Sequence, residues 1–335
     1  MKKLLSLLLS AALCLAVLAG CGAAPAPVSS APPESATPAA AFSVAALKGP
    51  TAMGLVKLMS DAENGGAVSN DYTFTLAGSA DEITPQLMRG ELDMACVPAN
   101  LAAVLYEKTQ GEIVTLAVNT LGVLYLVENG DTVASLSDLK GKTIVASGKG
   151  ATPEYALRYL LKENGLDPDK DVTIDWKSEH AECVSALASG AATVALLPQP
   201  FVTVAQGKLP GLRVALDLTA EWDKLDNGSA LLTGVVVARR AVVETSPAAV
   251  DGFLKDYAAS VAWVNANTAD AAALIGGYGI VDAAVAEKAL PHCNIVCLTG
   301  GELKDKLSGY LGVLYQENAP SVGGALPDDD FYYGA

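Results

Sequence analysis

Histidine and cysteine, the side chains that most often carry nucleophilic or metal chemistry, are few in this sequence. His180 and His292 are the only histidines among 335 residues. The stretch HCNIVC contains His292, Cys293 and Cys297. This spacing is compatible with half of a metal site or with a small disulfide loop. A tetrahedral zinc site needs about four ligands, and neither histidine falls at a predicted strand-to-helix turn. We therefore expect no metal, no cofactor and no catalytic residue. Buried thiols are the default expectation for Cys96, Cys183, Cys293 and Cys297.

Small, hydroxyl and amide residues follow the predicted strands, where the chain turns into helices. In open parallel sheets, ligands bind outside the carboxyl ends of the strands, where helix N-termini present unpaired N–H groups. Such turns follow the strands expected at 42–48, 72–78, 92–98, 142–147 and 193–199. These turns, with the extended stretch after residue 112, supply the candidate ligand-binding residues: Gly49, Thr51, Ala52, Ser79, Ala80, Asn100, Asn119, Tyr125, Gly150, Thr152 and Gln199.

Several of these candidates also have a purely structural interpretation. Ser79 and Glu82 stand in capping-box spacing, and Thr152 precedes Pro153 at the start of a predicted helix. Tyr125 and Asn119 are compatible with the lining of a cleft. Equally, Tyr125 is compatible with an aromatic residue of the core and Asn119 with a turn residue. The stretch GKGATP, 148–153, lacks the glycine spacing of a nucleotide-binding loop, although it suits a turn that receives an anion.

Strand and helix signals alternate along most of the chain, which predicts parallel strands with covering helices. The alternation runs from residue 42, gives way to a long extended stretch at 112–129, and restarts at 142–147. A second extended stretch at 231–240 leads back, and the remainder reads as helical. We therefore predict an α/β fold of two lobes joined by extended crossings. Lobe I comprises 42–120 and 232–335, and lobe II comprises 121–231.

The first residues read as an export signal. Lys2 and Lys3 precede an apolar run at 4–17, and LAGC at 18–21 resembles the lipobox of bacterial lipoproteins. This predicts a signal peptide at 1–20 and a lipid-modified Cys21. Residues 21–41 are rich in proline, alanine and serine, so we expect a disordered tether. The protein would then lie outside the cell, anchored to the outer face of the membrane.

Charge and hydropathy exclude two other classes. The formal net charge of −15 would repel a phosphate backbone, so nucleic-acid binding is not expected. The uncharged stretch 183–207 is the best candidate for a further membrane span. Gly190, Pro198 and Pro200 interrupt it, and a helix followed by a buried strand fits it better.

Three segments together resemble solute-binding lipoproteins of ABC importers, of the nitrate-, sulfonate- and thiamine-precursor-binding group. They are SLSDLKGKTIVASGKGATPEYALRYLLKENGLDPDKDVTIDW (135–176), SGAATVALLPQPFVTVA (189–205) and VVVARRAVVETSPAAVDGFLKDYAASVAWVNANTADAAALI (235–275). The resemblance covers essentially all of 43–335. It implies a type II periplasmic-binding-protein fold, a monomer that holds a small solute between two hinged lobes, and delivery to an ABC permease. It also implies that Gln199 faces the ligand.

Two other functions stay open at this point. Pyrimidine-synthesising and menaquinone-pathway enzymes resemble the same binders, but such chemistry needs a placed nucleophile, base or metal. A surface protein without a ligand would show a large apolar patch on its outer face.

Overall fold

The structure, a computed structural model, describes residues 39–335, and residues 38–335 form one compact unit. The expected signal peptide, Cys21 and nearly all of the expected tether lie outside the described residues. Within residues 39–335, every helix is too short or too polar to cross a bilayer. The stretch 183–207 forms most of one helix and then a buried strand, as predicted, followed by nearly all of a second helix.

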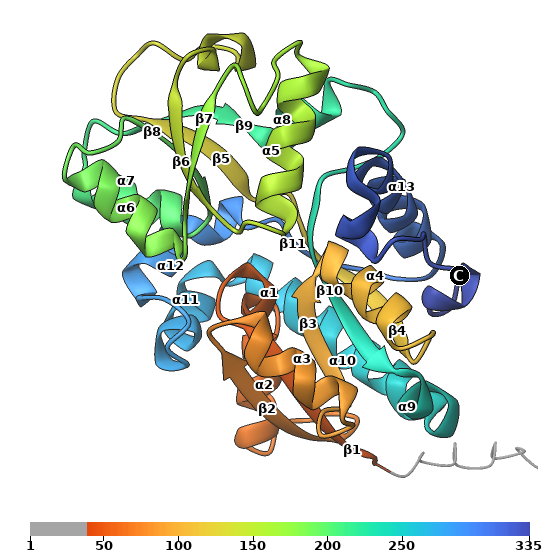
Figure 1. Ribbon diagram of the computed structural model, residues 1–335. Helices are drawn as coiled ribbons and strands as arrows, with labels where there is room; N and C mark the ends of the chain where they lie inside the picture. Colours follow the sequence, from red (N-terminus) through yellow and green to blue (C-terminus); the bar gives the residue numbers. More distant parts are fainter. Residues whose placement is uncertain (1–38) are drawn as a thin grey trace, which may run out of the picture. The chain divides into compact units, whose positions relative to one another are not determined.

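The first of two sheets has six strands in the described part of the chain (Figure 1). They are β1 (Ala41–Leu47), β2 (Asp71–Ala77), β3 (Met94–Pro98), β4 (Ile113–Leu121), β10 (Leu232–Arg239) and β11 (Ile295–Leu298), in the spatial order β11-β4-β10-β3-β1-β2. β1 pairs in parallel with β2 and β3, whereas β10 runs antiparallel to β3 and β4. The carboxyl ends of β1, β2 and β3 therefore meet at one edge of this sheet.

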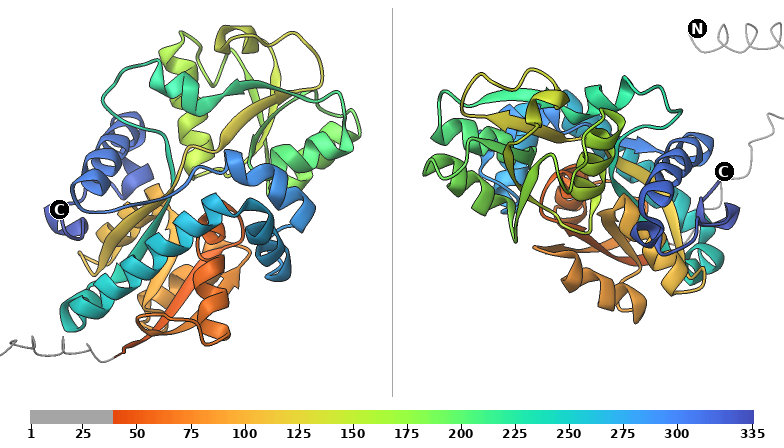
Figure 2. Two further views of the ribbon diagram at one scale, coloured as in Figure 1. Left: turned by 180° about the vertical axis from the view of Figure 1, so that it is seen from behind. Right: turned by 45° about the horizontal axis from the view of Figure 1, so that its top comes forward.

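Helices cover both faces of the first sheet because its strands are apolar on both sides. They are α1 (Pro50–Met53), α2 (Val56–Glu63), α3 (Ala80–Met88), α4 (Ala99–Lys108), α9 (Arg240–Thr245), α10 (Pro247–Ala266), α11 (Thr268–Gly277), α12 (Ala283–Ala289) and α13 (Gly300–Asn318). Val44 and Cys96 share a core with α2 and α10, and their neighbours Ala45 and Val97 share one with α3, α4 and α13. Figure 2 shows α10, in cyan, running along this sheet.

The second sheet has five strands among the described residues, in the order β7-β6-β8-β5-β9. Its elements are β5 (Leu124–Glu128), β6 (Thr143–Ser147), α5 (Thr152–Glu163), β7 (Thr173–Lys177), α6 (His180–Ala188), β8 (Val194–Pro198), α7 (Phe201–Lys208), β9 (Arg213–Asp217) and α8 (Leu218–Asp223). Short 3-10 turns lie at Leu136–Leu139, Leu290–His292, Ala319–Val322 and Asp329–Phe331. β6 is parallel to β7 and β8, so their carboxyl ends also share one edge.

The extended stretch expected at 112–129 is two strands, one in each sheet. β4 ends at Leu121 and β5 begins at Leu124, so Gly122 and Val123 form the crossing. Glycine is favoured at position 122, because a side chain there would clash with the Thr219 hydroxyl and crowd Leu231. β10 is the return crossing that the sequence predicts, whereas β11 lies in a region expected to be helical and corrects that expectation.

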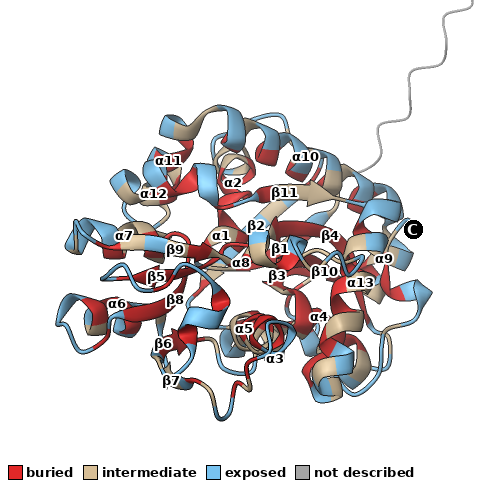
Figure 3. Ribbon diagram, turned by 90° about the horizontal axis from the view of Figure 1, so that it is seen from above, coloured by how far each residue is buried: buried red, intermediate tan, exposed pale blue. Residues whose placement is uncertain are grey.

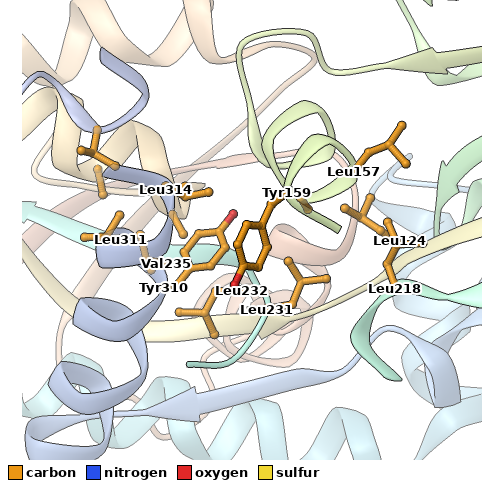
Figure 4. Close-up of a cluster of buried hydrophobic side chains, with 14 of the residues drawn as sticks. Leu124, Leu157, Tyr159, Leu218, Leu231, Leu232, Val235, Tyr310, Leu311 and Leu314 are labelled. Atoms are coloured by element: carbon orange, nitrogen blue, oxygen red, sulfur yellow. The ribbon is translucent and has the colours of Figure 1, made fainter. Parts of the chain in front are cut away.

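Buried side chains form three clusters, and one of them contains residues of both sheets. Figure 3 shows the strands of both sheets largely in the colour of buried residues. In this shared cluster, Tyr310 of α13 packs against Trp222 of α8, with ring centroids 5.7 Å apart. The Trp222 ring also packs against the Tyr159 ring of α5, with ring centroids 4.8 Å apart. Figure 4 shows Tyr159 and Tyr310 among leucines of α5, α13 and the return crossing. The two sheets are thus joined by apolar packing as well as by chain crossings.

The four cysteines in the described part of the chain are free thiols. Cys96, Cys183 and Cys293 are buried, as expected from the sequence, whereas Cys297 is half-buried. The Cys293 thiol donates to the Ala289 carbonyl at 3.2 Å. The HCNIVC stretch therefore forms no disulfide loop.

Candidate functional site

A cleft of about 190 Å³ lies where the carboxyl ends of strands from both sheets face each other. Its walls come from the ends of β1, β3, β6 and β8, the crossing at Val123, and the first turns of α1, α5, α6 and α7. The lining residues are Leu47, Lys48, Gly49, Pro50, Thr51, Pro98, Val123, Leu124, Gly148, Ala151, Thr152, Pro153, His180, Pro198, Gln199, Phe201 and Thr233. Its position agrees with the general rule for ligand sites in parallel sheets.

Four of the eleven sequence-based candidates line this cleft: Gly49, Thr51, Thr152 and Gln199. The Thr51 hydroxyl donates to the Leu47 carbonyl at 3.0 Å, which ties α1 to the end of β1. Gly49 has a φ of 141°, a conformation that favours glycine and lets the chain turn directly into α1.

Thr152 and Gln199 are each held by a neighbouring side chain. The Thr152 hydroxyl accepts a hydrogen bond from the Tyr310 hydroxyl at 3.1 Å, so α13 supports the start of α5. The Gln199 carbonyl oxygen accepts from the Thr203 hydroxyl at 2.9 Å. That bond leaves the amide NH2 of Gln199 as a donor without a partner among residues 39–335.

The remaining candidates lie outside this cleft lining: Ala52, Ser79, Ala80, Asn100, Asn119, Tyr125 and Gly150. Asn119 is fully buried and donates to the Thr51 carbonyl at 3.3 Å, so it supports the wall from behind. Asn100 donates to the Ser321 carbonyl and ties α4 to the C-terminal segment. Ser79 starts α3, where the Glu82 carboxylate accepts its N–H at 2.9 Å in the expected capping box.

Tyr125 lines a second, larger cavity of about 690 Å³ between β5, β9, α7 and α12. Gln199 borders both cavities. Asp217 and Lys288 place opposite charges in the second cavity. We take the smaller cleft as the candidate site because helix N-termini and polar side chains from both sheets converge there.

His180 is a site residue that sequence reasoning missed. β7 ends at Lys177 and α6 starts at His180, so this histidine does fall at a strand-to-helix turn. Its ring lies against Phe201, with centroids 4.9 Å apart, and its Nδ1 is hydrogen-bonded to the Ser147 hydroxyl. The expectation that neither histidine lies at such a turn was wrong for His180.

The cleft offers one formal positive charge and no carboxylate. Lys48 is the charged residue of the lining, and it makes no ion pair among residues 39–335. All five arginines of the sequence are paired with carboxylates elsewhere: Arg89 with Glu91, Arg158 with Asp169, Arg213 with Glu128, Arg239 with Asp93, and Arg240 with Asp330. A bidentate arginine clamp is therefore not part of this site.

One buried hydroxyl of the cleft wall lacks a hydrogen-bond partner. The Thr233 hydroxyl oxygen is buried and has no hydrogen-bond partner in the described part of the chain, although Thr233 lines the cleft. Such a buried polar atom is costly unless a ligand or water satisfies it.

The buried thiols of Cys96 and Cys293 lie outside the cleft lining. Burial raises the pKa of both thiols to about 12, so neither supplies a thiolate nucleophile near neutral pH.

Residues 67–227 match the model of a family described as the periplasmic substrate-binding protein of a phosphonate ABC transporter. The protein YtlA of Bacillus subtilis, which carries the name of a binding protein, is 26% identical over 150 residues. That alignment covers 43% of this chain and 44% of YtlA, so the chain matches less than half the length of this curated relative.

Solved structures with the same fold cover most of the chain. An ABC transporter protein of Parabacteroides distasonis has a TM-score of 0.73 and 24% identity, over 87% of this chain and 98% of that one. The periplasmic aliphatic sulphonate binding protein SsuA of Escherichia coli has a TM-score of 0.68 and 18% identity, over 86% and 92% of the two chains. The fold is thus that of type II periplasmic binding proteins, as expected.

The chain thus has the fold of type II periplasmic binding proteins and, over residues 67–227, resembles a family of substrate-binding proteins of ABC transporters.

Proposed function

We propose that the protein is the solute-binding component of an ABC importer and captures a small oxyanion in the cleft between the two sheets. The observation that carries this proposal is the composition of the cleft wall. Hydroxyl and amide donors from both sheets, with Lys48, line a space without any carboxylate. A cation would find no counter-charge there, whereas an oxyanion would find donors on both sides.

The size of the cleft favours a small solute. Its volume of about 190 Å³ is below the ~300–1,000 Å³ of sites for drug-sized ligands. Sulfonates, phosphonates and nitrate-like anions with a short substituent fit this range. A pyrimidine or thiamine precursor is the alternative within the same class, and Phe201 is the one aromatic ring of the lining on which such a ring could stack.

The chain path supports capture by closure. Lobe I would comprise 42–120 and 232–335, lobe II would comprise 121–231, and the crossings at Gly122 and the start of β10 would act as the hinge. A solute that contacts Thr51 in one lobe and Gln199 in the other stabilises the closed state. The lipid anchor at Cys21, the extracytoplasmic location and the permease partner belong to the same proposal.

A calorimetric and thermal-unfolding screen tests the proposal. Methylphosphonate, ethanesulfonate, nitrate and a hydroxymethylpyrimidine are added separately to the protein. At a free concentration 100 times Kd, a true ligand adds about 2.7 kcal/mol to the free energy of unfolding. Binding of at least one oxyanion supports the proposal. Binding of the pyrimidine alone would change the proposed ligand from an oxyanion to a pyrimidine. If no probe binds, the proposal is contradicted.

A further inference from the structure

The first turn of α5 presents one polar side chain to the cleft. Ala151, Thr152 and Pro153 line the cleft there, and of the three only Thr152 has a hydrogen-bonding side chain. Proline has no backbone N–H to offer. The N–H groups of Glu154 and Tyr155 donate to the carbonyl of residue 151, at 3.0 and 3.3 Å. What this turn can offer a solute therefore depends mainly on Thr152.

A tyrosine of the C-terminal helix is bonded to the Thr152 hydroxyl. Tyr310 of α13 is fully buried, and its hydroxyl oxygen lies 3.1 Å from the Thr152 hydroxyl oxygen. A phenol is more acidic than an aliphatic alcohol, so Tyr310 donates and Thr152 accepts. Burial raises the pKa of Tyr310, which keeps the phenol protonated. The Thr152 oxygen thus receives a proton from behind the cleft wall.

This hydrogen bond decides what Thr152 can do in the cleft. A threonine hydroxyl has one proton to donate and two lone pairs. One lone pair is occupied by Tyr310, and the proton has no acceptor among residues 39–335. Thr152 is only 2% exposed yet lines the cleft, so the cleft is the open direction for that proton. Donation from Tyr310 also polarises the Thr152 O–H and makes it a stronger donor.

Both partners of this hydrogen bond are held in place without a solute. The Tyr310 ring packs against Trp222 of α8, with ring centroids 5.7 Å apart. Lys162 of α5 forms an ion pair with Glu317 of α13, so the two helices are also tied further along. Thr152 is β-branched, which restricts its side-chain rotamers. The hydroxyl is therefore ordered in advance, and little further entropy is lost when it binds a solute.

We propose that Tyr310 is a positioning residue of the cleft: it holds the Thr152 hydroxyl as a hydrogen-bond donor, so that this point of the wall selects a solute oxygen that can only accept. This inference rests on the proposed function. A helix that covers the first sheet, and whose residues lie outside the cleft lining, thereby takes part in recognition through a residue of the second sheet. An ionised sulfonate or phosphonate oxygen meets a donor there, whereas an N–H group in the same place would meet another proton.

Matched tyrosine variants test the positioning role. Tyr310→Phe keeps the ring and loses only the hydroxyl. We expect it to raise the Kd of the oxyanions that bind the wild-type protein about fivefold, the effect of one hydrogen bond. Tyr106→Phe is the control, because the Tyr106 hydroxyl is also bonded to a distant residue, Asp330 at 2.7 Å, but lies outside the cleft lining. Its Kd should stay at the wild-type value. Calorimetry with ethanesulfonate, methylphosphonate and nitrate measures Kd, and thermal unfolding checks that each variant is folded.

A double-mutant cycle separates positioning from a merely structural role. Thr152→Val removes the hydroxyl through which Tyr310 acts and keeps the side-chain shape. We expect it to raise Kd about tenfold, and Tyr310→Phe to add no further change in that background. Thr152→Ser keeps the hydroxyl but loses the β-branch, so binding should depend on Tyr310 more strongly than in the wild-type protein. A structural role of Tyr310 would instead weaken binding by the same factor in all three backgrounds.

The outcomes distinguish this inference from the proposed function. Wild-type affinity in Tyr310→Phe or in Thr152→Val, or equal effects of Tyr310→Phe with and without the Thr152 hydroxyl, would overturn the inference while the proposed function stands. If none of the three oxyanions binds the wild-type protein, the proposed oxyanion site fails and the inference fails with it.

Discussion

Single side chains show where stability and binding compete in the cleft. Thr233 and Thr115 both carry a buried hydroxyl without a partner among residues 39–335, but only Thr233 lines the cleft. Valine has nearly the shape of threonine and removes the unsatisfied group. We expect Thr233→Val to raise the free energy of unfolding by about 1 kcal/mol and to weaken oxyanion binding.

Thr115→Val is the matched control for Thr233→Val, because Thr115 is fully buried in β4 away from the cleft. It should raise the stability by a similar amount and leave binding unchanged. Urea unfolding and calorimetry with ethanesulfonate measure both quantities for each variant. Unchanged affinity in Thr233→Val would show that this hydroxyl does not meet the ligand.

Packing around glycine gives a second prediction for single residues. A Cβ at Gly54 would lie 2.8 Å from the Tyr257 hydroxyl oxygen and 3.0 Å from Ile295 Cγ2, both parts of a closely packed core. Gly54→Ala is therefore expected to lower the free energy of unfolding by about 1–3 kcal/mol. Gly312→Ala in α13, where a Cβ meets nothing within 4 Å, should instead raise it by about 0.5–1 kcal/mol. Thermal unfolding of the two variants tests the contrast in sign.

At the scale of secondary-structure elements, a buried carboxylate joins β5 to β9. Glu128 accepts hydrogen bonds from the Thr132 hydroxyl, from the N–H groups of Thr132 and Val133, and from Arg213. Burial acts to raise the pKa of Glu128, but these hydrogen bonds outweigh it and lower the pKa below the usual value. The carboxylate thus stabilises the fold above the unfolded-state pKa of about 4.3, and this contribution is lost as the pH falls through the lower folded-state value.

Removal of the arginine leaves that carboxylate buried without its charged partner. We expect Arg213→Met to lower the free energy of unfolding at pH 7 by about 2 kcal/mol, less than the ~3–5 kcal/mol of a fully buried pair because Arg213 is 36% exposed. The loss should shrink at pH 3, below the unfolded-state pKa, because removal of the arginine makes the Glu128 carboxylate easier to protonate. Urea unfolding at the two pH values measures it, with the exposed Arg89→Met as the control. An equal loss at both pH values would contradict the electrostatic origin.

The order of elements was predictable from sequence because strand and helix periods are local signals. The α3 capping box is one example, since Ser79 and Glu82 are three residues apart. Partners far along the chain were not predictable: Asn119 bonds to residue 51 and supports the cleft wall, whereas Asn100 bonds to residue 321 and ties α4 to the C-terminal segment. His180 was missed because α6 starts without a side-chain cap, so no local signal marks its first turn.

For the whole molecule, the apolar cluster that both sheets share predicts how the described part of the chain unfolds. Tyr310 of α13 contacts Trp222 of α8 and donates to Thr152 of α5, and Lys162 of α5 pairs with Glu317 of α13. These contacts join a helix that covers the first sheet to two helices of the second. We therefore expect one cooperative unfolding transition, in which tryptophan fluorescence and far-UV circular dichroism change at the same urea concentration.

Loss of the Tyr310 ring should uncouple the two sheets. Tyr310→Ala removes a fully buried aromatic side chain and is expected to cost about 3–5 kcal/mol. Because the cavity lies between elements of different sheets, the elements around Trp222 should lose their packing first, and the fluorescence transition should precede the circular dichroism transition. Tyr310→Phe keeps the packing, loses only the hydrogen bond to Thr152, and should cost about 1 kcal/mol with coincident transitions. Coincident transitions in Tyr310→Ala would mean that the chain crossings alone suffice to couple the sheets, and the shared cluster would then contribute stability without setting cooperativity.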